Sequence, residues 1–510
     1  MNYLDLFRVT LPETALEVAA LVVLVFDLAF LRKAPLQTRA TVAALVGVIG
    51  CGASILMMVF QTQSGLSYPG TGELLLSVGG YTSVAQAGIL ALTVLTLFLL
   101  IDSDFTQHVG EYVAVVLMAA TGGLLIAAAQ DLLVIFVGLE LLSLGLYILT
   151  GFAKHSGKSA ESAMKYYLFG GMATAFLLFG FSYLYGIAGS TSLHQIMLAM
   201  YRPNAAVAAP LLYVALVMVA AGLGFKVAAV PFHLWAPDTY EGAPAPAAAF
   251  IASVSKVASF ALLIGISTAA AHVFGDAQVV KVAVGTASGK HSGYQGFGVP
   301  WSAILVALSL ASMVLGNLAA LAQTSVRRLL AYSAMAHAGY ILLALAFFSY
   351  SAESTNAILY YILTYGLTTI GAFGVVAVVE RATGSDRMDA FLGLHKRSPI
   401  LADILFVLFL SLAGIPPLVG FWAKFNLFVA VLRVSAGVVP FALVALAVGL
   451  SAVSLYYYLQ VLKRVYVMPA VDETPIEAHP VTMGVLILIA AAVLVLGCFP
   501  ALLQEWIGGF

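Results

Sequence analysis

Three lysines and one glutamate fall inside long apolar runs: Lys226 in LVMVAAGLGFKVAAV, Lys256 in AAAFIASVSKVASFALLI, Lys424 in PPLVGFWAKFNLFVAVL and Glu140 in LLVIFVGLELLSLGLYIL. An ionisable side chain at bilayer depth costs at least about 2.5 kcal/mol, and such groups usually mark an ion or proton path. A lysine near a helix end can instead extend its ammonium group to the membrane surface. Because four such residues occur together, the pattern favours a series of proton-binding groups.

Two histidines extend this set of candidates. His337 lies in LLAYSAMAHAGYIL, and His233 lies in PFHLW shortly after Pro231. Histidine changes its charge near neutral pH, which suits it to passing protons between neighbours. A lone histidine on an apolar helix is more often a hydrogen-bonded core residue, so a relay role and a structural role both stay open here.

The elements that must position these residues are long apolar helices. Of the 510 residues, 62% are hydrophobic and 9% are charged, and the apolar residues come in blocks of about twenty, the length with which an α-helix crosses the hydrocarbon core. The sequence therefore predicts an all-α membrane protein with about 14 transmembrane helices. They are expected at roughly 12–31, 41–60, 79–101, 111–129, 131–151, 162–187, 208–230, 245–271, 301–322, 329–349, 356–380, 401–431, 438–462 and 482–503.

Composition and motifs exclude several other classes of function. The net charge of −1 offers no basic surface for nucleic acid. The two cysteines, Cys51 and Cys498, stand far apart in the sequence, so no spacing could hold an iron–sulfur cluster or a structural zinc ion. No phosphate loop, GxSxG motif or dinucleotide fingerprint occurs. We therefore expect no metal site and no cofactor-binding site in this chain.

The basic residues predict the orientation in the membrane. An even number of spans places both termini on one side. With the termini outside, fourteen lysines and arginines fall on the cytoplasmic side and five outside, and the three buried lysines complete the 22. Because positive residues gather in cytoplasmic loops, both termini are expected on the extracytoplasmic side. The Gly-rich segment 273–300 is expected to be an extracytoplasmic loop.

The predicted spans form two sets of five. Helices 1–3 occupy 1–110, the first set (helices 4–8) 111–272, the second set (helices 9–13) 301–466, and the last helix 467–510. An odd number of spans per set inverts the second set relative to the first, a common architecture of transporters.

Corresponding spans of the two sets carry comparable residues. The fourth span of each set contains a helix breaker: Pro231 follows Lys226, and the pair Pro416 and Pro417 precedes Lys424. Proline removes a backbone donor, which is tolerated at membrane depth where the freed carbonyls face protein or a water-filled cavity. Each set is therefore predicted to contain one broken helix beside one buried lysine. The second spans correspond as well, one with Glu140 and the other with His337.

The segment PFHLWAPDTYEGAP (231–244), with Lys226 five residues before its first proline, resembles the proton-conducting membrane subunits of respiratory complex I and the related Mrp-type cation/proton antiporters. The resemblance covers nearly the whole chain. PDTYEGAP and the lysine of GIPPLVGFWAKF are most similar to subunit N of NADH:quinone oxidoreductase, whereas an M-type subunit would be expected to have glutamate at position 424. An L-type subunit would continue into a long lateral helix.

The resemblance implies a subunit that couples electron transfer from NADH to quinone to proton pumping and carries no redox centre itself. It makes Glu140 the acid that partners Lys226, Lys256 the central relay lysine, and Lys424 the lysine of the second half-channel. NADH, FMN, iron–sulfur clusters and quinone are then expected in partner subunits. The expected neighbours are sister antiporter-like subunits and small membrane subunits, in the bilayer of a cell inner (plasma) membrane.

A mechanism follows from these groups. Burial disfavours the charged form of lysine and a nearby carboxylate favours it, so separating Glu140 from Lys226 would push a proton towards Lys256 and then Lys424. Two alternatives stay open. A Mrp-type cation/proton antiporter subunit would move Na⁺ or K⁺ against protons with the same lysines. A membrane scaffold with incidental buried charges would keep full turnover after loss of a lysine.

Overall fold

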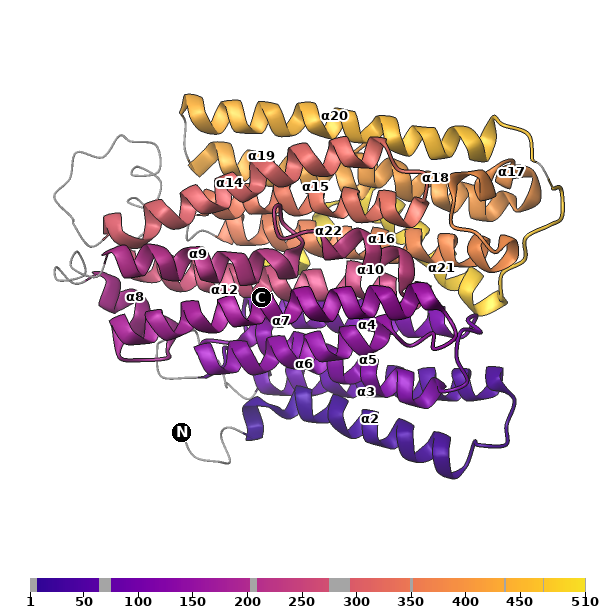
Figure 1. Cartoon of the computed structure of the whole chain (residues 1–510), viewed down its shortest axis with the longest axis horizontal. Coiled ribbons are helices and arrows are strands. Elements are labelled where there is room, and N and C mark those ends of the chain that lie inside the picture. Colours follow the sequence, from indigo (N-terminus) through magenta and orange to yellow (C-terminus); the bar gives the residue numbers. More distant parts are fainter. Residues whose placement is uncertain are drawn as a thin grey trace.

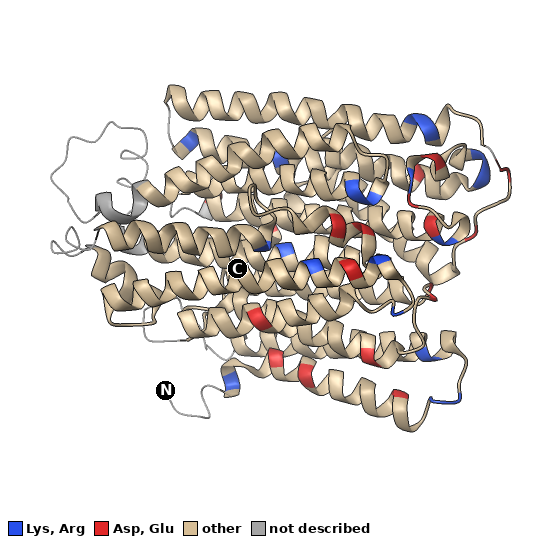
Figure 2. Ribbon diagram, in the orientation of Figure 1, with Lys and Arg blue, Asp and Glu red and all other residues tan. Residues whose placement is uncertain are grey.

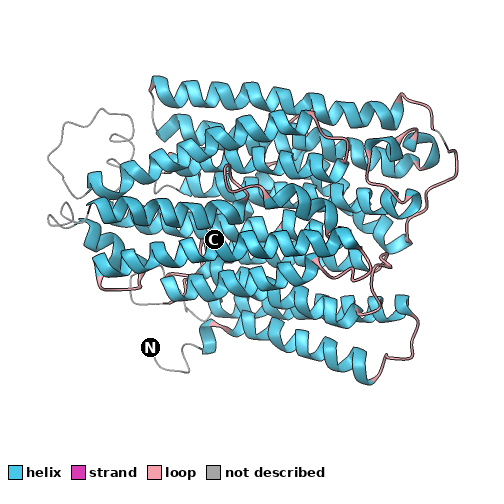
Figure 3. Cartoon of the chain, in the orientation of Figure 1, coloured by secondary structure: helices cyan, strands magenta, loops and turns pink. Residues whose placement is uncertain are grey.

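A computed structural model of the chain describes residues 7–63, 75–201, 209–274, 294–348, 352–434, 437–470 and 472–509. This part of the chain is almost entirely helical, and its extended pairing is limited to isolated bridges (Figure 3). A helix pairs its backbone groups within one segment, whereas an isolated extended segment would leave them unpaired in the bilayer. The predicted all-α fold is confirmed.

The long helices run side by side along one direction (Figure 1). The first part of the chain forms α2 (Leu11–Ala29), α3 (Leu36–Gln63) and α4 (Tyr81–Leu100). The first set forms α5 (Val109–Ala128), α6 (Leu132–Thr150), α7 (Gly157–Ala188), α8 (Leu193–Tyr201), α9 (Ala209–Val227), α10 (Trp235–Gly242), α11 (Ala245–Ala252) and α12 (Val254–Phe274).

The second set begins with α14 (Tyr294–Leu321), α15 (Val326–Ala346) and α16 (Ala352–Thr383). The remaining elements are the short η2 (Met388–Phe391) and α17 (Leu394–Arg397), then α18 (Pro399–Ala413), α19 (Val419–Val434), α20 (Val438–Tyr466), α21 (Pro480–Cys498) and α22 (Ala501–Gly508). Much of the predicted loop 273–300 lies outside the described residues. Its last residues belong to α14, which begins at 294 instead of the predicted 301.

Twelve helices in the described part of the chain are long and apolar enough to cross a membrane. Two further expected spans coincide with other helices. The first is α2, which carries Glu13, Glu17 and Asp27, and the other is the interrupted pair α18 and α19. Helices therefore occupy all the expected span positions, while the exact number of crossings stays a prediction.

The first helices of the two sets, α5 and α14, run in opposite directions through the bundle. Asp104 precedes α5 and Thr324 follows α14, yet both line one cavity, so the start of α5 and the end of α14 lie at the same end of the bundle. In both sets the first two helices pack extensively against each other, α5 with α6 and α14 with α15. These features agree with the predicted inversion, and the repeat itself stays a prediction.

Charged residues gather towards one end of the bundle, at the right of Figure 2. The described ends of the chain lie away from it. α2 begins beside the end of α3, where Gln61 donates a hydrogen bond to the Val9 carbonyl over 3.0 Å, and α22 packs on α16. The described ends of the chain thus lie towards one end of the bundle, with Gly508 beside Asn356 near the start of α16, while the placement of the termini and the side of the membrane that they face stay predictions.

The centre of the bundle is formed by α11, α12, α15 and α16. In the apolar stretch of Ala245–Ala271 100% of the residues are buried, and in that of Val326–Ala346 94% are buried. The corresponding share in the peripheral α20 is 28%. Hydrogen-bonding side chains fix where several helices begin. Asp131 caps α6 through the Leu133 amide over 2.8 Å, and Ser325 caps α15 through the Arg328 amide over 3.1 Å. Two of the six candidate residues, Lys256 on α12 and His337 on α15, lie on these central helices.

Candidate functional site

The first broken helix of the prediction is present. α9 ends at Val227, Pro231 lies in the connection, and α10 begins at Trp235. The indole of Trp235 donates to the carbonyl of Phe225 over 2.9 Å, and the Val230 amide donates to Ser312 on α14 over 2.9 Å. Side chains of neighbouring elements thus satisfy backbone groups that the break releases.

The second broken helix is present as well. α18 ends at Ala413, and α19 begins at Val419 after the two prolines. The ammonium group of Lys424 donates to the carbonyls of Leu412 and Ala413 over 3.0 and 2.9 Å and to the Ser451 hydroxyl over 2.8 Å. All three ammonium hydrogens have acceptors, and the cation lies at the negative end of the α18 dipole. Gly414, with φ +88°, allows this approach because an added Cβ would lie 2.9 Å from Lys424 Cδ.

Lys226 is oriented differently, towards the helix that carries Glu140. It is 6% exposed and donates a hydrogen bond to Ser143 on α6, and its ammonium group lies 5.9 Å from the Tyr147 ring. Glu140, one turn before Ser143, accepts a hydrogen bond from Thr174 over 2.7 Å. Among the described residues no ion pair joins Glu140 to Lys226, so the two groups approach the same stretch of α6 without touching.

Lys256 lies at the centre of the bundle and is 3% exposed. Its ammonium group donates to the Ala334 carbonyl on α15 over 2.7 Å and lies 6.0 Å from the Tyr365 ring on α16. Its helix is interrupted at Ser253, whose hydroxyl bonds back to the Ala249 carbonyl over 2.6 Å. The sequence had predicted one continuous helix over 245–271. Serine that bonds to the carbonyl four residues earlier often bends a helix, which accounts for the difference.

His337 joins the central lysine to the second set. Its Nδ1 lies 2.8 Å from the Tyr361 hydroxyl, and its ring centroid lies 4.9 Å from that of Tyr365 and 5.9 Å from that of Tyr340. Lys424 in turn places its ammonium group 5.5 Å from the Tyr340 ring. Neighbouring contacts therefore lead from Lys256 through Tyr365, His337 and Tyr340 to Lys424.

The second ring nitrogen of His337 lies beside a small cavity. Its Nε2 is buried and has no hydrogen-bond partner, and Thr364, Thr368 and Ser411 line the cavity beside it. A cavity with several hydroxyl groups can hold a water molecule that bridges buried polar groups. His337 thus has a hydrogen-bond partner on one side and a polar cavity beside it, an arrangement suited to proton transfer.

His233 lies apart from this series of contacts. It is buried in the connection between α9 and α10, and its Nδ1 has no hydrogen-bond partner. In the described part of the chain, no hydrogen bond or ring contact joins it to any of the three buried lysines. Among the described contacts, none joins Lys226 and its partners Ser143 and Tyr147 to Lys256 and its partners Ala334 and Tyr365.

The sequence-based set missed the tyrosines and two serines. Tyr340, Tyr361 and Tyr365 surround His337, while Ser143 and Ser451 accept hydrogen bonds from two of the lysines. The dense run of Tyr and Thr in ILYYILTYGLTTI (358–370) was a possible signal, because several hydroxyl groups on one apolar helix need partners.

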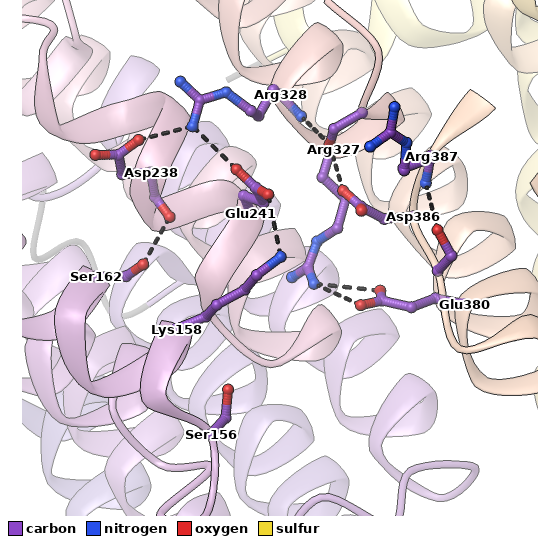
Figure 4. A network of polar contacts seen from close by, with 12 residues as sticks. Ser156, Lys158, Ser162, Asp238, Glu241, Arg327, Arg328, Glu380, Asp386 and Arg387 are labelled. Carbon is purple, nitrogen blue, oxygen red and sulfur yellow. Dashed lines mark hydrogen bonds and ion pairs between the residues drawn. The ribbon is translucent and has the colours of Figure 1, made fainter. Parts of the chain in front are cut away.

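A cavity of about 710 Å³ opens at the charged end of the bundle, between the two sets. Five acidic and five basic side chains line it, and Figure 4 shows the ion pairs that several of them form. Since the opposite charges are equal in number, the cavity offers no excess charge to attract an anion or a cation. We refer to it as the charged vestibule.

Comparison with known proteins identifies the group to which the chain belongs. A family model described as NADH:quinone oxidoreductase/Mrp antiporter, TM, matches residues 129–290 and 277–451. NADH-quinone oxidoreductase subunit N 2 of Acidobacterium capsulatum is 46% identical over 99% of this chain and 99% of its own length. The chain belongs to the NADH:quinone oxidoreductase/Mrp antiporter family. The resemblance to subunit N that the segment 231–244 carries is confirmed.

Solved structures agree with this family. A chain of respiratory complex I from Thermus thermophilus with bound aureothin is 32% identical, with a TM-score of 0.76 over 97% of this chain and 98% of its own. A chain of the Mrp complex from a Dietzia species has a TM-score of 0.77 at 21% identity, over 99% of this chain and 97% of its own. The second similarity shows that antiporter subunits of the family share the fold.

Proposed function

We propose that this chain is the proton-translocating membrane subunit of a NADH:quinone oxidoreductase. One observation carries the proposal: neighbouring contacts lead from Lys256 through Tyr365, His337 and Tyr340 to Lys424 inside the most buried helices. Buried ionisable groups are costly at membrane depth, and their placement within contact of one another suits a proton relay. As in its subunit N relatives, the driving energy would come from electron transfer in partner subunits.

Glu140 and Lys226 form the input side of the proposed relay. Lys226 binds Ser143, one turn from Glu140, so a modest shift of α9 along α6 would bring the ammonium group to the carboxylate. When the Lys226 side chain approaches the Glu140 carboxylate, its charged form is favoured. When the two groups separate, the charged form is disfavoured, and Lys226 would release a proton towards Lys256. In the described residues Thr174 donates to the Glu140 carboxylate and no ion pair joins Glu140 to Lys226, which corresponds to the separated arrangement of this proposal.

The two histidines take different places in the proposal. His337 passes the proton between the Lys256 group and the Lys424 group, through its contacts with Tyr361 and the polar cavity. His233 lies in the first break with a buried nitrogen that has no hydrogen-bond partner. We assign it to the uncontacted stretch after Lys226, where a water molecule at this nitrogen would extend the relay.

The proposal includes partners and location. Sister antiporter-like subunits and small membrane subunits would bind laterally, and NADH, FMN, iron–sulfur clusters and quinone would bind in other subunits. The chain would lie in a cell inner membrane with both termini outside and the charged vestibule towards the cytoplasm. The charge gradient along the bundle supports this orientation, because basic residues gather on the cytoplasmic side of membrane proteins.

Substitution of the central lysine tests the proposal. Lys256→Gln, compared with Lys154→Gln in an exposed loop, would be assayed in membrane vesicles for NADH-dependent quinone reduction and for proton uptake. We expect Lys256→Gln to lower both rates about tenfold or more, since one well-placed proton-transfer group typically contributes ~10²-fold or more. Parent-level rates in both assays would place Lys256 outside the path and favour the scaffold reading.

A Mrp-type cation/proton antiporter subunit is the second candidate, because the matching family model covers both groups and the Dietzia chain has the same fold. It predicts that proton transport needs Na⁺ or K⁺ and that the chain purifies without flavin and iron–sulfur proteins. Vesicle assays in choline buffer separate the two candidates. Proton uptake that persists in this buffer and requires NADH supports the oxidoreductase subunit.

A further inference from the structure

Two adjacent arginines at the start of α15 join the two sets at the charged vestibule (Figure 4). Arg327 and Arg328 follow the cap residue Ser325, and α15 belongs to the second set. Both arginines nevertheless contact the segment that follows the break of the first set, α10 and its connection to α11.

Arg328 holds the side chains of α10. Its Nη1 donates to Asp238 over 2.7 Å and to Glu241 over 2.9 Å. From the other side, Lys165 on α7 donates to the second oxygen of Asp238 over 2.8 Å. α10 lies outside the helices that are long and apolar enough to cross a membrane. Partial burial raises the pKa of Asp238, but the hydrogen bonds from Lys165 and Arg328 together lower it by more, so that the pKa lies below its usual value. Asp238 is therefore a carboxylate shared by one cation from each set.

Arg327 holds the backbone at the end of α10. It is 3% exposed, donates to both carboxylate oxygens of Glu380 on α16 over 3.2 Å, and donates to the carbonyl of Ala243. Ala243 connects α10 to α11, the helix that leads to Lys256. The neighbouring Gly242 packs directly on α7, since an added Cβ would lie 2.0 Å from the Ser162 hydroxyl. α10 is thus held between α7 and α15 at the edge of the charged vestibule, which Glu241 and Gly242 line.

The other end of this connection reaches the proposed relay. From Arg328, α15 continues to Ala334, whose carbonyl accepts the hydrogen bond of Lys256, and to His337. Arg328 and His337 are nine residues apart in one helix, a distance of about 13 Å at ~1.5 Å per residue. A helix of this length moves largely as one body, so a displacement of its first turn also displaces Ala334 and His337.

We propose that Arg327 and Arg328 are positioning residues that couple the two sets, by transmitting movement of the broken helix beside Lys226 through α15 to the acceptor of Lys256 and to His337. The inference rests on the proposed function. When the broken helix moves towards or away from Lys226, α10 shifts. Arg327 and Arg328 then move α15 with α10, and the hydrogen bond from Lys256 to the Ala334 carbonyl lengthens or shortens. The relay in the second set then responds to the state of the first.

The test measures coupling separately from turnover. Arg328→Gln, Asp238→Asn, the double variant and Arg328→Lys would be prepared in the complete complex. Arg433→Gln is the matched control, since it removes an exposed arginine–glutamate pair, with Glu353, near the opposite end of the bundle. Vesicles would be assayed for protons taken up per NADH oxidised, and native gels would check assembly.

We expect Arg328→Gln and Asp238→Asn each to lower the number of protons per NADH, with turnover lowered by less than about fivefold, because partly exposed ion pairs contribute little to stability. The double variant should lose less than the two single losses combined, because both substitutions remove the Arg328–Asp238 contact, while Arg328 also binds Glu241 and Asp238 also binds Lys165. Arg328→Lys should recover part of the ratio, as it keeps the charge but loses the planar fork. The control should keep the parent ratio.

Two outcomes would overturn the coupling role: a parent-level ratio in Arg328→Gln, or a double variant whose loss equals both single losses combined. Lys256→Gln distinguishes this failure from failure of the proposed function. If Lys256→Gln stops pumping while Arg328→Gln keeps the parent ratio, the relay stands and the coupling role is wrong. If Lys256→Gln pumps normally, the proposed function itself fails.

Discussion

The two broken helices solve one structural problem with different groups. In the second set, the lysine itself satisfies the carbonyls that the break releases, because Lys424 binds Leu412 and Ala413. In the first set, the indole of Trp235 binds the released Phe225 carbonyl, and Lys226 reaches across to another helix. The lysine beside the break therefore stabilises the broken helix in the second set, whereas in the first set the lysine makes no described hydrogen bond to the carbonyls of its break.

This difference separates the two lysines in mobility. Lys424 makes three hydrogen bonds, each of them to a carbonyl or hydroxyl that lies beside its own break or on the next helix. Lys226 has one described hydrogen bond, to a serine of α6. Hydrogen bonds of charged groups contribute about 1.5–3 kcal/mol each, so Lys226 needs less energy to change partners. This supports its assignment to the switch.

The largest expected effect comes from removing each lysine in turn. Lys424→Ala should stop proton pumping and also destabilise the complex, because the Leu412 carbonyl loses the Lys424 hydrogen bond at about 1–3 kcal/mol and the Ala413 carbonyl keeps only the Ser451 hydroxyl at 3.4 Å. Lys226→Ala should lower turnover and pumping together but assemble normally, since loss of a lone buried charge does not by itself cost stability. Native gels and thermal inactivation of the purified complexes compare the two. Equal stability of both variants would contradict the comparison.

Trp235→Phe should give the next largest effect. The substitution removes the indole N–H that donates to the Phe225 carbonyl, which keeps the Ala228 amide as a donor over 3.0 Å. It retains an aromatic ring beside Tyr166, whose ring centroid lies 4.3 Å from that of Trp235. We expect a loss of about 0.5–1.5 kcal/mol of local stability, the net contribution of one neutral hydrogen bond, measured as faster thermal inactivation. Trp422→Phe is the corresponding variant of the second set, since its indole donates to the Gly497 carbonyl and Gly497 packs on Pro417 and Leu418 in that break. A loss of similar size is expected there.

Sequence reasoning located the lysines and the breaks because both depend on local features. A charge in an apolar run and a proline in a predicted span can be read from a few neighbouring residues, as at Lys226 and Pro231. The missing ion pair between Glu140 and Lys226 could not be read in this way. It depends on how α6 and α9 are rotated and shifted against each other, which the apolar pattern leaves open.

The tyrosines around His337 were missed for a related reason. A tyrosine on an apolar helix is usually a packed core residue, and only the placement of α16 beside α15 brings Tyr361 and Tyr365 to the imidazole. The Arg328 contacts with α10 join residues 90 and 87 positions apart. Such contacts follow from tertiary packing, so the relay and the coupling contacts needed the structure.

A smaller effect should separate charge from hydrogen bonding at Glu140. Glu140→Gln keeps an acceptor oxygen for Thr174 but removes the negative charge, whereas Glu140→Asp keeps the charge at a slightly greater distance. If the carboxylate stabilises the ammonium group of Lys226, Gln should lower turnover more than Asp does. Steady-state quinone reduction in membranes checks this order. Equal rates in both variants would point to a packing role for Glu140.

The smallest effects should come from the two serines that bind the lysines. Ser143→Ala removes the one described hydrogen bond of Lys226, whereas Ser451→Ala leaves Lys424 with both carbonyls of Leu412 and Ala413. One hydrogen bond of a charged group corresponds to about tenfold or more in an equilibrium constant when nothing replaces it. Ser143→Ala should therefore lower pumping measurably, and Ser451→Ala should stay near the parent rate. Each substitution removes one serine hydroxyl group. A larger loss of pumping in Ser451→Ala than in Ser143→Ala would therefore mean that Lys424, and not Lys226, is the more easily disturbed lysine.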